Sequence, residues 1–302
     1  MAKPRGPLVS WLTRRVGYPL EAVLVHGFCG LFRALPVDRA SALGGWIGRT
    51  VGPRLRGTRT ARRNLERAFP EKSRAEIDAI VLGMWDNLGR VIAEYPHLDA
   101  IGAYGPGGRT EVIGAEHIDA LRDDGKAGIL VSGHFANWEV KPVCSRKMGL
   151  ELAVVYRAPN NPYVSRLLTE LRGAAGGTHI PKGPEGARTL IRVLTKGGHV
   201  GMLIDQKMND GMPVPFFGRD AMTAPAAAQL ALRLGIPLVP ARTERLDGAR
   251  FRITVLPPVE SPNTGDRNAD VRILMERLNG LLEQWIRERP AEWLWLHRRW
   301  PD

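Results

Sequence analysis

The residues best suited to chemistry lie at 133–139, where the chain reads Gly-His-Phe-Ala-Asn-Trp-Glu. His134 and Glu139 are five positions apart, so a tight turn could bring the carboxylate back to the imidazole. A carboxylate on one ring nitrogen fixes the tautomer and raises the basicity of the other nitrogen, which can then remove a proton from an alcohol. We therefore expect His134 to be a general base whose ring is held by Glu139. The alternative is a helix-capping glutamate beside a buried, hydrogen-bonded histidine.

A strand before this stretch and a helix after it would position the pair. Residues 128–131 form a short apolar run closed by Ser132-Gly133, which predicts a buried strand. A helix can begin after it, with Asn137 as the N-cap. His134 would then lie at the carboxyl end of a strand, where open α/β sheets bind their ligands.

Two more polar residues are expected at the same sheet edge. Arg157 follows a predicted strand at 152–156, and Asp205 follows one at 199–204. The carboxyl ends of parallel strands share one edge, so both side chains should lie near His134. Asp205 would orient Arg157, a backbone amide or a substrate hydroxyl. The alternatives are a surface ion pair for Arg157 and a turn or helix cap for Asp205.

The remaining pattern alternates strands with helices, which predicts an α/β fold with a mainly parallel sheet covered by helices. Further strands are expected at 237–242 and 251–256, and helices at 163–171, 188–194 and 270–288, with a last helix from Pro290. Ser73 and Glu76 resemble a capping box at the start of another helix that reaches Tyr95. No flexible linker or repeat interrupts the chain, so we expect one domain over 36–302, preceded by a helical extension over 1–35.

The extension contains an apolar segment at 16–35 that is interrupted by Glu21, His26 and Arg33. Charges inside a bilayer are costly, so this segment is a poor membrane span. It is a better interfacial anchor, because the flanking arginines could meet lipid phosphates. The alternative is an ordinary amphipathic helix packed on the domain.

The chain is strongly basic, with 43 Lys and Arg against 31 Asp and Glu. Residues 1–76 hold 15 of the basic residues and 5 of the acidic ones, so most of the excess lies in the first quarter. Such a field suits anionic phospholipid, nucleic acid or an acidic protein. Nucleic acid is the weakest of these, because no zinc-finger spacing or RNA-recognition motif accompanies the charge. The two cysteines, Cys29 and Cys144, predict small buried hydrophobes rather than a disulfide framework.

The stretch at 133–139 resembles the motif of a histidine, four residues and an acid in the lysophospholipid acyltransferase superfamily. The form is that of the bacterial late acyltransferases of lipid A biosynthesis. Other marks of that family follow in matching order: Tyr156-Arg157, Asn161-Pro162, Asp205-Gln206, Pro215-Phe216-Phe217-Gly218 and Trp295-Leu296-His297-Arg298-Arg299-Trp300. The likeness runs from about Leu20 to the end of the chain, and the ordered set is more specific than any one of its parts.

The resemblance implies an enzyme that moves a fatty acyl group from an acyl carrier protein thioester to a hydroxyl of a lipid A precursor. It also implies a place at the cytoplasmic face of the inner membrane. Both substrates can react in one ternary complex, so no Ser or Cys nucleophile, metal or cofactor is expected. We expect substrates to contact Arg157, Asp205, Gln206, Phe216 and Phe217. The two phenylalanines could line an acyl-chain channel or simply fill the core.

Two later segments allow more than one interpretation. Thr223 could cap a helix of small residues whose amides attract negative charge. The tail with Trp293, Trp295 and Trp300 fits either interfacial anchoring or packing against the sheet.

Other functions stay open as alternatives. The acceptor could be a lysophospholipid or another glycolipid, such as a mannosylated phosphoinositide, because the superfamily shares the histidine and acid motif. A basic peripheral membrane protein could also bind lipid without chemistry and keep His134 for its fold. Metal-dependent hydrolysis is weaker, because His117, His179, His199 and His297 show no zinc spacing.

Overall fold

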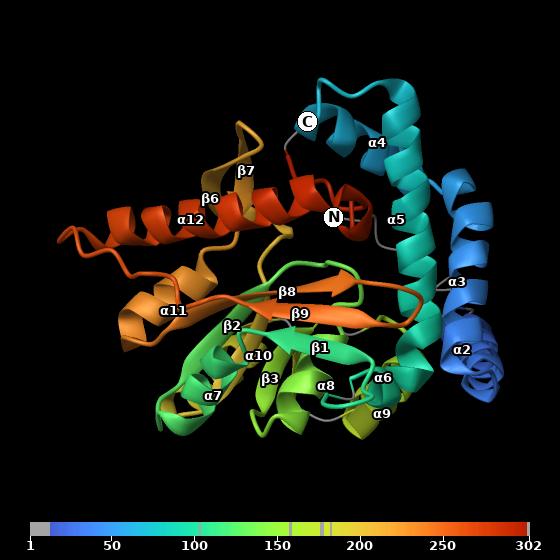
Figure 1. The fold of residues 1–302 in the computed structure, drawn as a ribbon, viewed down its shortest axis with the longest axis horizontal. Helices are drawn as coiled ribbons and strands as arrows, with labels where there is room; N and C mark the ends of the chain where they lie inside the picture. Colours follow the sequence, from blue (N-terminus) through green and yellow to red (C-terminus); the bar gives the residue numbers. More distant parts are fainter. Residues whose placement is uncertain (1–12, 103, 157–158, 176–177, 182, 301–302) are drawn as a thin grey trace.

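Seven strands form one sheet at the centre of the protein, in the order β1-β9-β8-β2-β5-β3-β4 (Figure 1). The computed structural model describes residues 13–102, 104–156, 159–175, 178–181 and 183–300. The strands are β1 Thr110–Ile113, β2 Gly128–Ser132, β3 Leu152–Tyr156, β4 His179–Pro181, β5 His199–Leu203, β8 Leu238–Arg245 and β9 Phe251–Val255. The expected α/β class is confirmed.

Most neighbouring strands are parallel, as predicted. Strands β4, β3, β5, β2 and β8 all run the same way. Strand β9 is antiparallel to β8, and β1 is parallel to β9 at the far edge. The predicted strands at 128–131, 152–156, 199–204, 237–242 and 251–256 are confirmed within a few residues, whereas β1 and β4 were not predicted. Both are short edge strands with little apolar periodicity of their own.

Helices cover both faces of the sheet, because alternate side chains of each strand point to opposite sides. Ile129 and Val131 of β2 belong to the core that α10, α11 and α12 share. Leu130 between them belongs to the core on the other face, with α7 and α8. The helices are α7 Ala115–Asp123, α8 Val140–Lys147, α9 Pro162–Ala175, α10 Pro184–Thr195, α11 Ala226–Leu234 and α12 Arg267–Glu288.

A two-stranded hairpin replaces the loop expected around 213–218. Strand β6, Lys207–Phe216, pairs antiparallel with β7, Arg219–Thr223. Thr223 therefore ends a strand and does not cap the next helix, whose N-cap position is Pro225. The prolines and glycine of the segment had suggested a loop, but prolines are tolerated on the free edges of a short hairpin.

The N-terminal part is helical. Its elements are η1 Thr13–Gly17, α2 Tyr18–Ala34, α3 Val37–Val51, η2 Gly52–Arg54, α4 Gly57–Ala68, α5 Arg74–Glu94, η3 Tyr95–His97 and α6 Leu98–Ile101. Helix α5 stands along one end of the sheet, and α3 and α2 lie on its outer side (Figure 1). The predicted capping box at the start of α5 is confirmed, since the Ser73 and Glu76 side chains each bond the other residue's backbone.

Helix α2 covers most of the segment at 16–35 and packs on the domain along part of its surface. It packs on the domain through Phe32, whose carbonyl accepts a hydrogen bond from His97. Other apolar side chains on α2 stay exposed, and they are Leu20, Val23, Leu24 and Leu31. Among the described residues, no helix is long and apolar enough to cross a bilayer.

The C-terminal segment is not the helix expected from Pro290. Only a single 3₁₀ turn forms, η4 Pro290–Glu292. Trp293 then forms an isolated antiparallel bridge with Phe135 in the loop after β2, and a turn follows at 295–296. Its backbone groups are used there, because Glu292 accepts from the Ala136 N–H and Leu294 donates to the His134 carbonyl. Of the two interpretations of the tryptophan tail, packing is the one observed, since Trp293, Trp295 and Trp300 are all buried.

Helices α3 and α5 touch through glycines, which yields a stability prediction. A Cβ on Gly89 of α5 would collide with the carbonyl of Gly44 on α3. We expect Gly89→Ala to lower the free energy of unfolding by roughly 1–3 kcal/mol through overpacking. In Gly30→Ala, on the open side of α2, the new Cβ meets nothing within 4 Å. That control should be neutral or stabilise by up to about 1 kcal/mol. Equal denaturation curves for the two variants would contradict the close packing.

Candidate active site

The loops that follow β2 and β5 meet at one edge of the sheet. These strands are parallel neighbours with Ser132 opposite Leu203, and the Ile204 N–H donates to the Ser132 carbonyl over 2.9 Å. His134 and Asp205 each lie two residues beyond their strand. The predicted convergence of these two side chains at the carboxyl ends of the strands is therefore observed.

Asp205 holds both the backbone and the ring of His134. Its Oδ2 accepts from the His134 backbone N–H at 2.7 Å and from the indole N–H of Trp293 at 2.7 Å, while its Oδ1 lies 2.8 Å from His134 Nδ1. Gly133 makes room for this, because a Cβ there would lie 3.1 Å from Asp205 Oδ2. A backbone amide was one of the partners expected for Asp205.

The charge of Asp205 is maintained despite complete burial. Burial alone would raise the pKa of this carboxyl, but the charge of His134 and the hydrogen bonds from His134 and Trp293 hold it below its ordinary value. An ionised carboxylate only accepts hydrogen bonds, so His134 Nδ1 must carry the proton. In a neutral ring, Nε2 is then the basic nitrogen.

His134 Nε2 faces Gln206, a residue that was expected to contact substrate. Gln206 Nε2 lies 3.2 Å from His134 Nε2 and 2.9 Å from His297 Nε2. The two amide hydrogens of Gln206 can serve both ring nitrogens, which agrees with an unprotonated Nε2 on His134. His297 was not expected in the site, although it belongs to the tail motif that carried the family resemblance.

Asp205 holds a ring nitrogen of His134, the role that was expected for Glu139. Glu139 accepts a hydrogen bond from the Tyr95 hydroxyl, and its own backbone N–H donates to Asn137 Oδ1 over 3.2 Å. Helix α8 begins at Val140 with Glu139 in the N-cap position, so the cap expected at Asn137 is two residues too early. The sequence spacing could not reveal Asp205 as the partner of His134, because 71 residues separate them.

The other residues expected to contact substrate are Arg157, Phe216 and Phe217. Arg157 lies outside the described residues. Phe216 and Phe217 fill the core, the second of the two roles considered for them, with 1% and 7% of their surface exposed. The Phe216 ring stacks on Trp300, and the Phe217 ring packs against Phe69.

A small apolar cavity of about 70 Å³ opens beside the loop at 133–139, which we call the catalytic loop because the candidate base His134 lies on it. It is lined by Trp138, Glu139 and Tyr156 and, below them, by side chains of β2, β3 and β5. Lys141 also faces it and donates to Thr243 Oγ1 over 2.9 Å. Burial lowers the pKa of Lys141 to about 7, although the negative charges of Asp205 and Glu139 act in the opposite direction. No group of three or more His, Cys, Asp or Glu side chains that could hold a metal ion occurs in the described part of the chain.

Comparison with known proteins identifies the family. The family described as "Bacterial lipid A biosynthesis acyltransferase" matches residues 10–302. The chain belongs to this family. The lipid A biosynthesis lauroyltransferase of Escherichia coli (strain K12) is 28% identical over 256 residues, which cover 81% of this chain and 79% of that protein. The palmitoleoyltransferase of the same organism is 25% identical over 284 residues, 90% and 88% of the two chains. The phosphatidylinositol mannoside acyltransferase of Mycolicibacterium smegmatis is 25% identical over 276 residues, 89% and 88% of the two chains.

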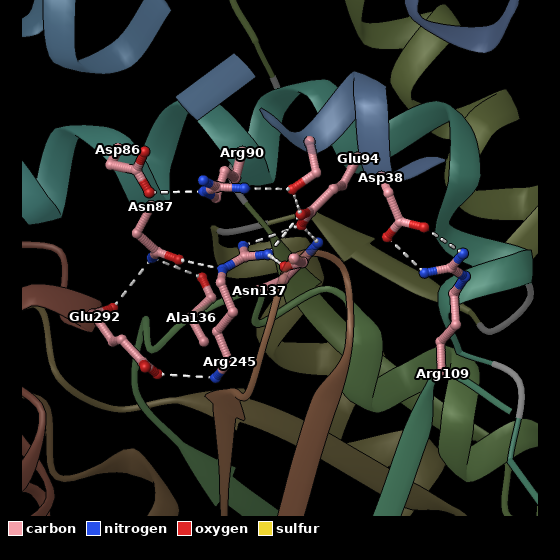
Figure 2. Close-up of polar contacts among 12 residues, drawn as sticks. Asp38, Asp86, Asn87, Arg90, Glu94, Arg109, Ala136, Asn137, Arg245 and Glu292 are labelled. Atoms are coloured by element: carbon pink, nitrogen blue, oxygen red, sulfur yellow. Dashed lines mark hydrogen bonds and ion pairs between the residues drawn. The ribbon is translucent and has the colours of Figure 1, made fainter. Parts of the chain in front are cut away.

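In this acyltransferase, a buried ion pair adjoins the catalytic loop (Figure 2). Arg245 at the end of β8 meets Glu94 at the end of α5, with Nη1 to Oε1 at 2.5 Å and Nη2 to Oε2 at 3.1 Å. Glu94 is fully buried and also accepts from the Ser41 hydroxyl of α3 at 2.6 Å. Three parts of the chain thus converge on one carboxylate.

The same network holds the acyltransferase loop that follows His134. The Asn137 amide donates to Glu94 Oε2 over 2.9 Å, and the Asn87 amide donates to the Ala136 carbonyl over 3.1 Å (Figure 2). Ala136 has a φ of 44°, a left-handed conformation that is rare for a residue with a Cβ. Such strain persists only where the surroundings determine it, and here both backbone groups of Ala136 are bonded. The helical N-terminal part therefore shapes the catalytic loop.

This network predicts unequal effects for two ion pairs of the acyltransferase. Glu94→Gln would leave the Arg245 guanidinium buried without a counter-charge, so we expect a loss of about 3–5 kcal/mol in the free energy of unfolding. Asp38→Asn breaks the pair with Arg109 (Figure 2), in which the Asp38 side chain is 59% exposed, and should cost only about 0–1 kcal/mol. Chemical denaturation of both variants measures the difference. A Glu94→Gln variant as stable as the Asp38→Asn control would refute the structural role of the pair.

Proposed function

We propose that this acyltransferase moves a fatty acyl group from an acyl carrier protein thioester to a hydroxyl of a lipid A precursor, with His134 as the general base. The observation that carries the proposal is the buried Asp205 carboxylate on His134 Nδ1, which leaves Nε2 basic at the edge of the sheet. The names of the relatives support lipid A as the acceptor class.

The proposed reaction uses one ternary complex. His134 Nε2 takes the proton of the acceptor hydroxyl while that oxygen attacks the thioester carbonyl carbon. Asp205 stabilises the imidazolium that forms, in the manner of the aspartate in serine hydrolases. When the tetrahedral intermediate collapses, the carbon–sulfur bond breaks and the thiolate takes the proton from the imidazolium. The chemistry needs no cofactor or metal.

Two further side chains have supporting roles in this proposal. The Gln206 amide, within hydrogen-bond distance of His134 Nε2, is a donor for the developing oxyanion. Glu139 adds a second negative charge in the same loop and favours the imidazolium at longer range. Its hydrogen bond with Tyr95 keeps the carboxylate in place.

We also propose that α2 lies in the surface of the inner membrane, on its cytoplasmic face. Leu20, Val23 and Leu24 are each more than half exposed, and the exposed Arg14 and Arg15 precede them. Apolar side chains next to arginines suit the boundary between acyl chains and anionic headgroups. The basic N-terminal part would also attract an acidic carrier protein.

The membrane role of α2 predicts a loss of binding without a loss of fold. The double variant Leu20→Glu and Leu24→Glu should reduce co-sedimentation with phosphatidylglycerol vesicles by about tenfold or more, because both side chains would otherwise enter the apolar layer. Ile113→Glu with Ile191→Glu is the matched control, since these side chains are also exposed but lie on β1 and α10. Equal losses in the two double variants would indicate a charge effect without a role for α2.

The function is tested with a labelled acyl carrier protein thioester and a panel of acceptors. We expect the label to pass to a lipid A precursor, and the product is identified by mass spectrometry. Transfer to a mannosylated phosphoinositide instead would move this chain to the activity named for the mycobacterial relative. Binding of lipid without any acylated product would favour a lipid-binding protein.

The assignment of Asp205 is tested by Asp205→Asn. The amide cannot stabilise an imidazolium and can favour the wrong tautomer, so we expect kcat to fall about 10³- to 10⁴-fold with little change in KM. The kcat of the His134→Ala variant should fall at least as far. If Glu139→Gln lost as much activity as His134→Ala while Asp205→Asn stayed near wild type, Glu139 would be the carboxylate that supports the base.

A further inference from the structure

A basic cleft of about 670 Å³ lies between η2 and the start of α4, apart from the residues of the active site. Four arginines line it, and they are Arg54, Arg56, Arg59 and Arg62. Leu55 and Thr58 complete most of the remaining wall. We call this feature the arginine cleft.

The charge of the arginine cleft is mostly uncompensated. Arg62 pairs with Asp78 at 2.7 Å, and Arg54 donates to the carbonyl of Thr50. The side chains of Arg56 and Arg59 are exposed and have no hydrogen-bond or ion-pair partner among the residues that the structure describes. A concave surface lined by one sign of charge concentrates ions of the opposite sign. The cleft is therefore built for an anion.

Helix α4 connects the cleft to the catalytic edge of the sheet. Asn64 of α4 donates to the carbonyls of Trp295 and His297, over 2.8 and 2.5 Å. The His297 ring lies 5.9 Å from the His134 ring, centroid to centroid. Arg59 and Asn64 are on the same helix, so the cleft keeps a defined position relative to the base.

An apolar surface adjoins the cleft. Leu55 in its wall is 47% exposed, as is Val51 at the end of α3, and Trp46 one turn earlier is 57% exposed. Exposed apolar and tryptophan side chains beside arginines are typical of surfaces that meet lipid at the headgroup level. The anion suited to this place is thus part of a lipid.

We propose that the arginine cleft binds a phosphate group of the glycolipid acceptor and so positions its hydroxyl toward His134. The proposal rests on the function proposed above, in which the acceptor is a phosphorylated lipid. Guanidinium groups bind phosphate oxygens through two parallel hydrogen bonds, and lysine does not reproduce that geometry. Arg56 and Arg59 are the residues free to do so.

The test is the double variant Arg56→Gln and Arg59→Gln. With saturating acyl donor, we expect KM for the phosphorylated acceptor to rise about 10- to 100-fold while kcat changes little, because the lost hydrogen bonds act on binding and leave the base intact. With the same acceptor stripped of phosphate, variant and wild type should have equal KM. Replacing both arginines by lysine should restore only part of the affinity.

The matched control is Arg188→Gln with Arg192→Gln on α10. It removes the same charge from exposed positions of another helix, so it should leave KM for the acceptor unchanged. An equal rise in KM in this control would overturn the proposal in favour of a general charge effect. An unchanged KM for the acceptor in the Arg56 and Arg59 variant would overturn it as well.

Other occupants of the cleft give different results. If the variant raises KM for the acyl carrier thioester but not for the acceptor, the cleft docks the carrier protein and the proposal is wrong. If it only weakens binding to phosphatidylglycerol vesicles, the cleft binds bulk lipid headgroups and the proposal is again wrong. A direct binding assay with phosphorylated and dephosphorylated acceptor in detergent tests the cleft separately from the proposed acyl transfer. Phosphate-dependent binding that requires Arg56 and Arg59 would support the role of the cleft even if no acyl transfer were detected.

Discussion

A buried negative charge at the edge of the sheet is the constraint on which the catalytic region depends. Asp205 is almost completely buried, and an unpaired carboxylate there would be prohibitively costly. Its donors come from two distant segments, the loop of His134 and the C-terminal stretch of Trp293. The charge can be accommodated only when strand β5, the catalytic loop and the C-terminal stretch are all in place. The interaction that orients the proposed base is therefore also an interaction that assembles the fold.

A second buried charge connects the helical N-terminal part to the same loop. Glu94 and Arg245 neutralise each other, and the spare hydrogen-bonding capacity of Glu94 is used by Ser41 and Asn137. A buried ion pair of this kind adds little net stability compared with apolar packing, but it offsets its desolvation cost only when both side chains are held in one defined geometry. Its benefit here is the defined shape of the loop at Ala136. The site is thus supported from two sides, by Asp205 in the sheet and by Glu94 on α5.

The structure places several of the basic residues of the N-terminal part next to exposed apolar side chains. Six of the 15 basic residues before position 77 lie at two places, Arg14 and Arg15 just before α2 and the four arginines of the arginine cleft. Exposed apolar side chains accompany both places. A lipid substrate presents the same combination, an anionic headgroup next to acyl chains. The two contacts proposed above, of α2 with the bilayer surface and of the arginine cleft with the acceptor phosphate, would together bring the hydroxyl to the base without extracting the lipid into water.

The sequence by itself determined the fold class, five of the seven sheet strands, the capping box on α5 and the place of His134 at a strand end, because these follow from local periodicity and capping. The ordered motifs also identified the family. Only the tertiary structure decided which carboxylate holds His134, since Asp205 and Trp293 approach it across long stretches of chain. It also decided that Phe216, Phe217 and the tryptophan tail fill the core, and that the segment after the 3₁₀ turn at Pro290 is irregular and not helical. Aromatic residues suit a core, a channel or a membrane surface equally well, and only the packing around them separates these roles.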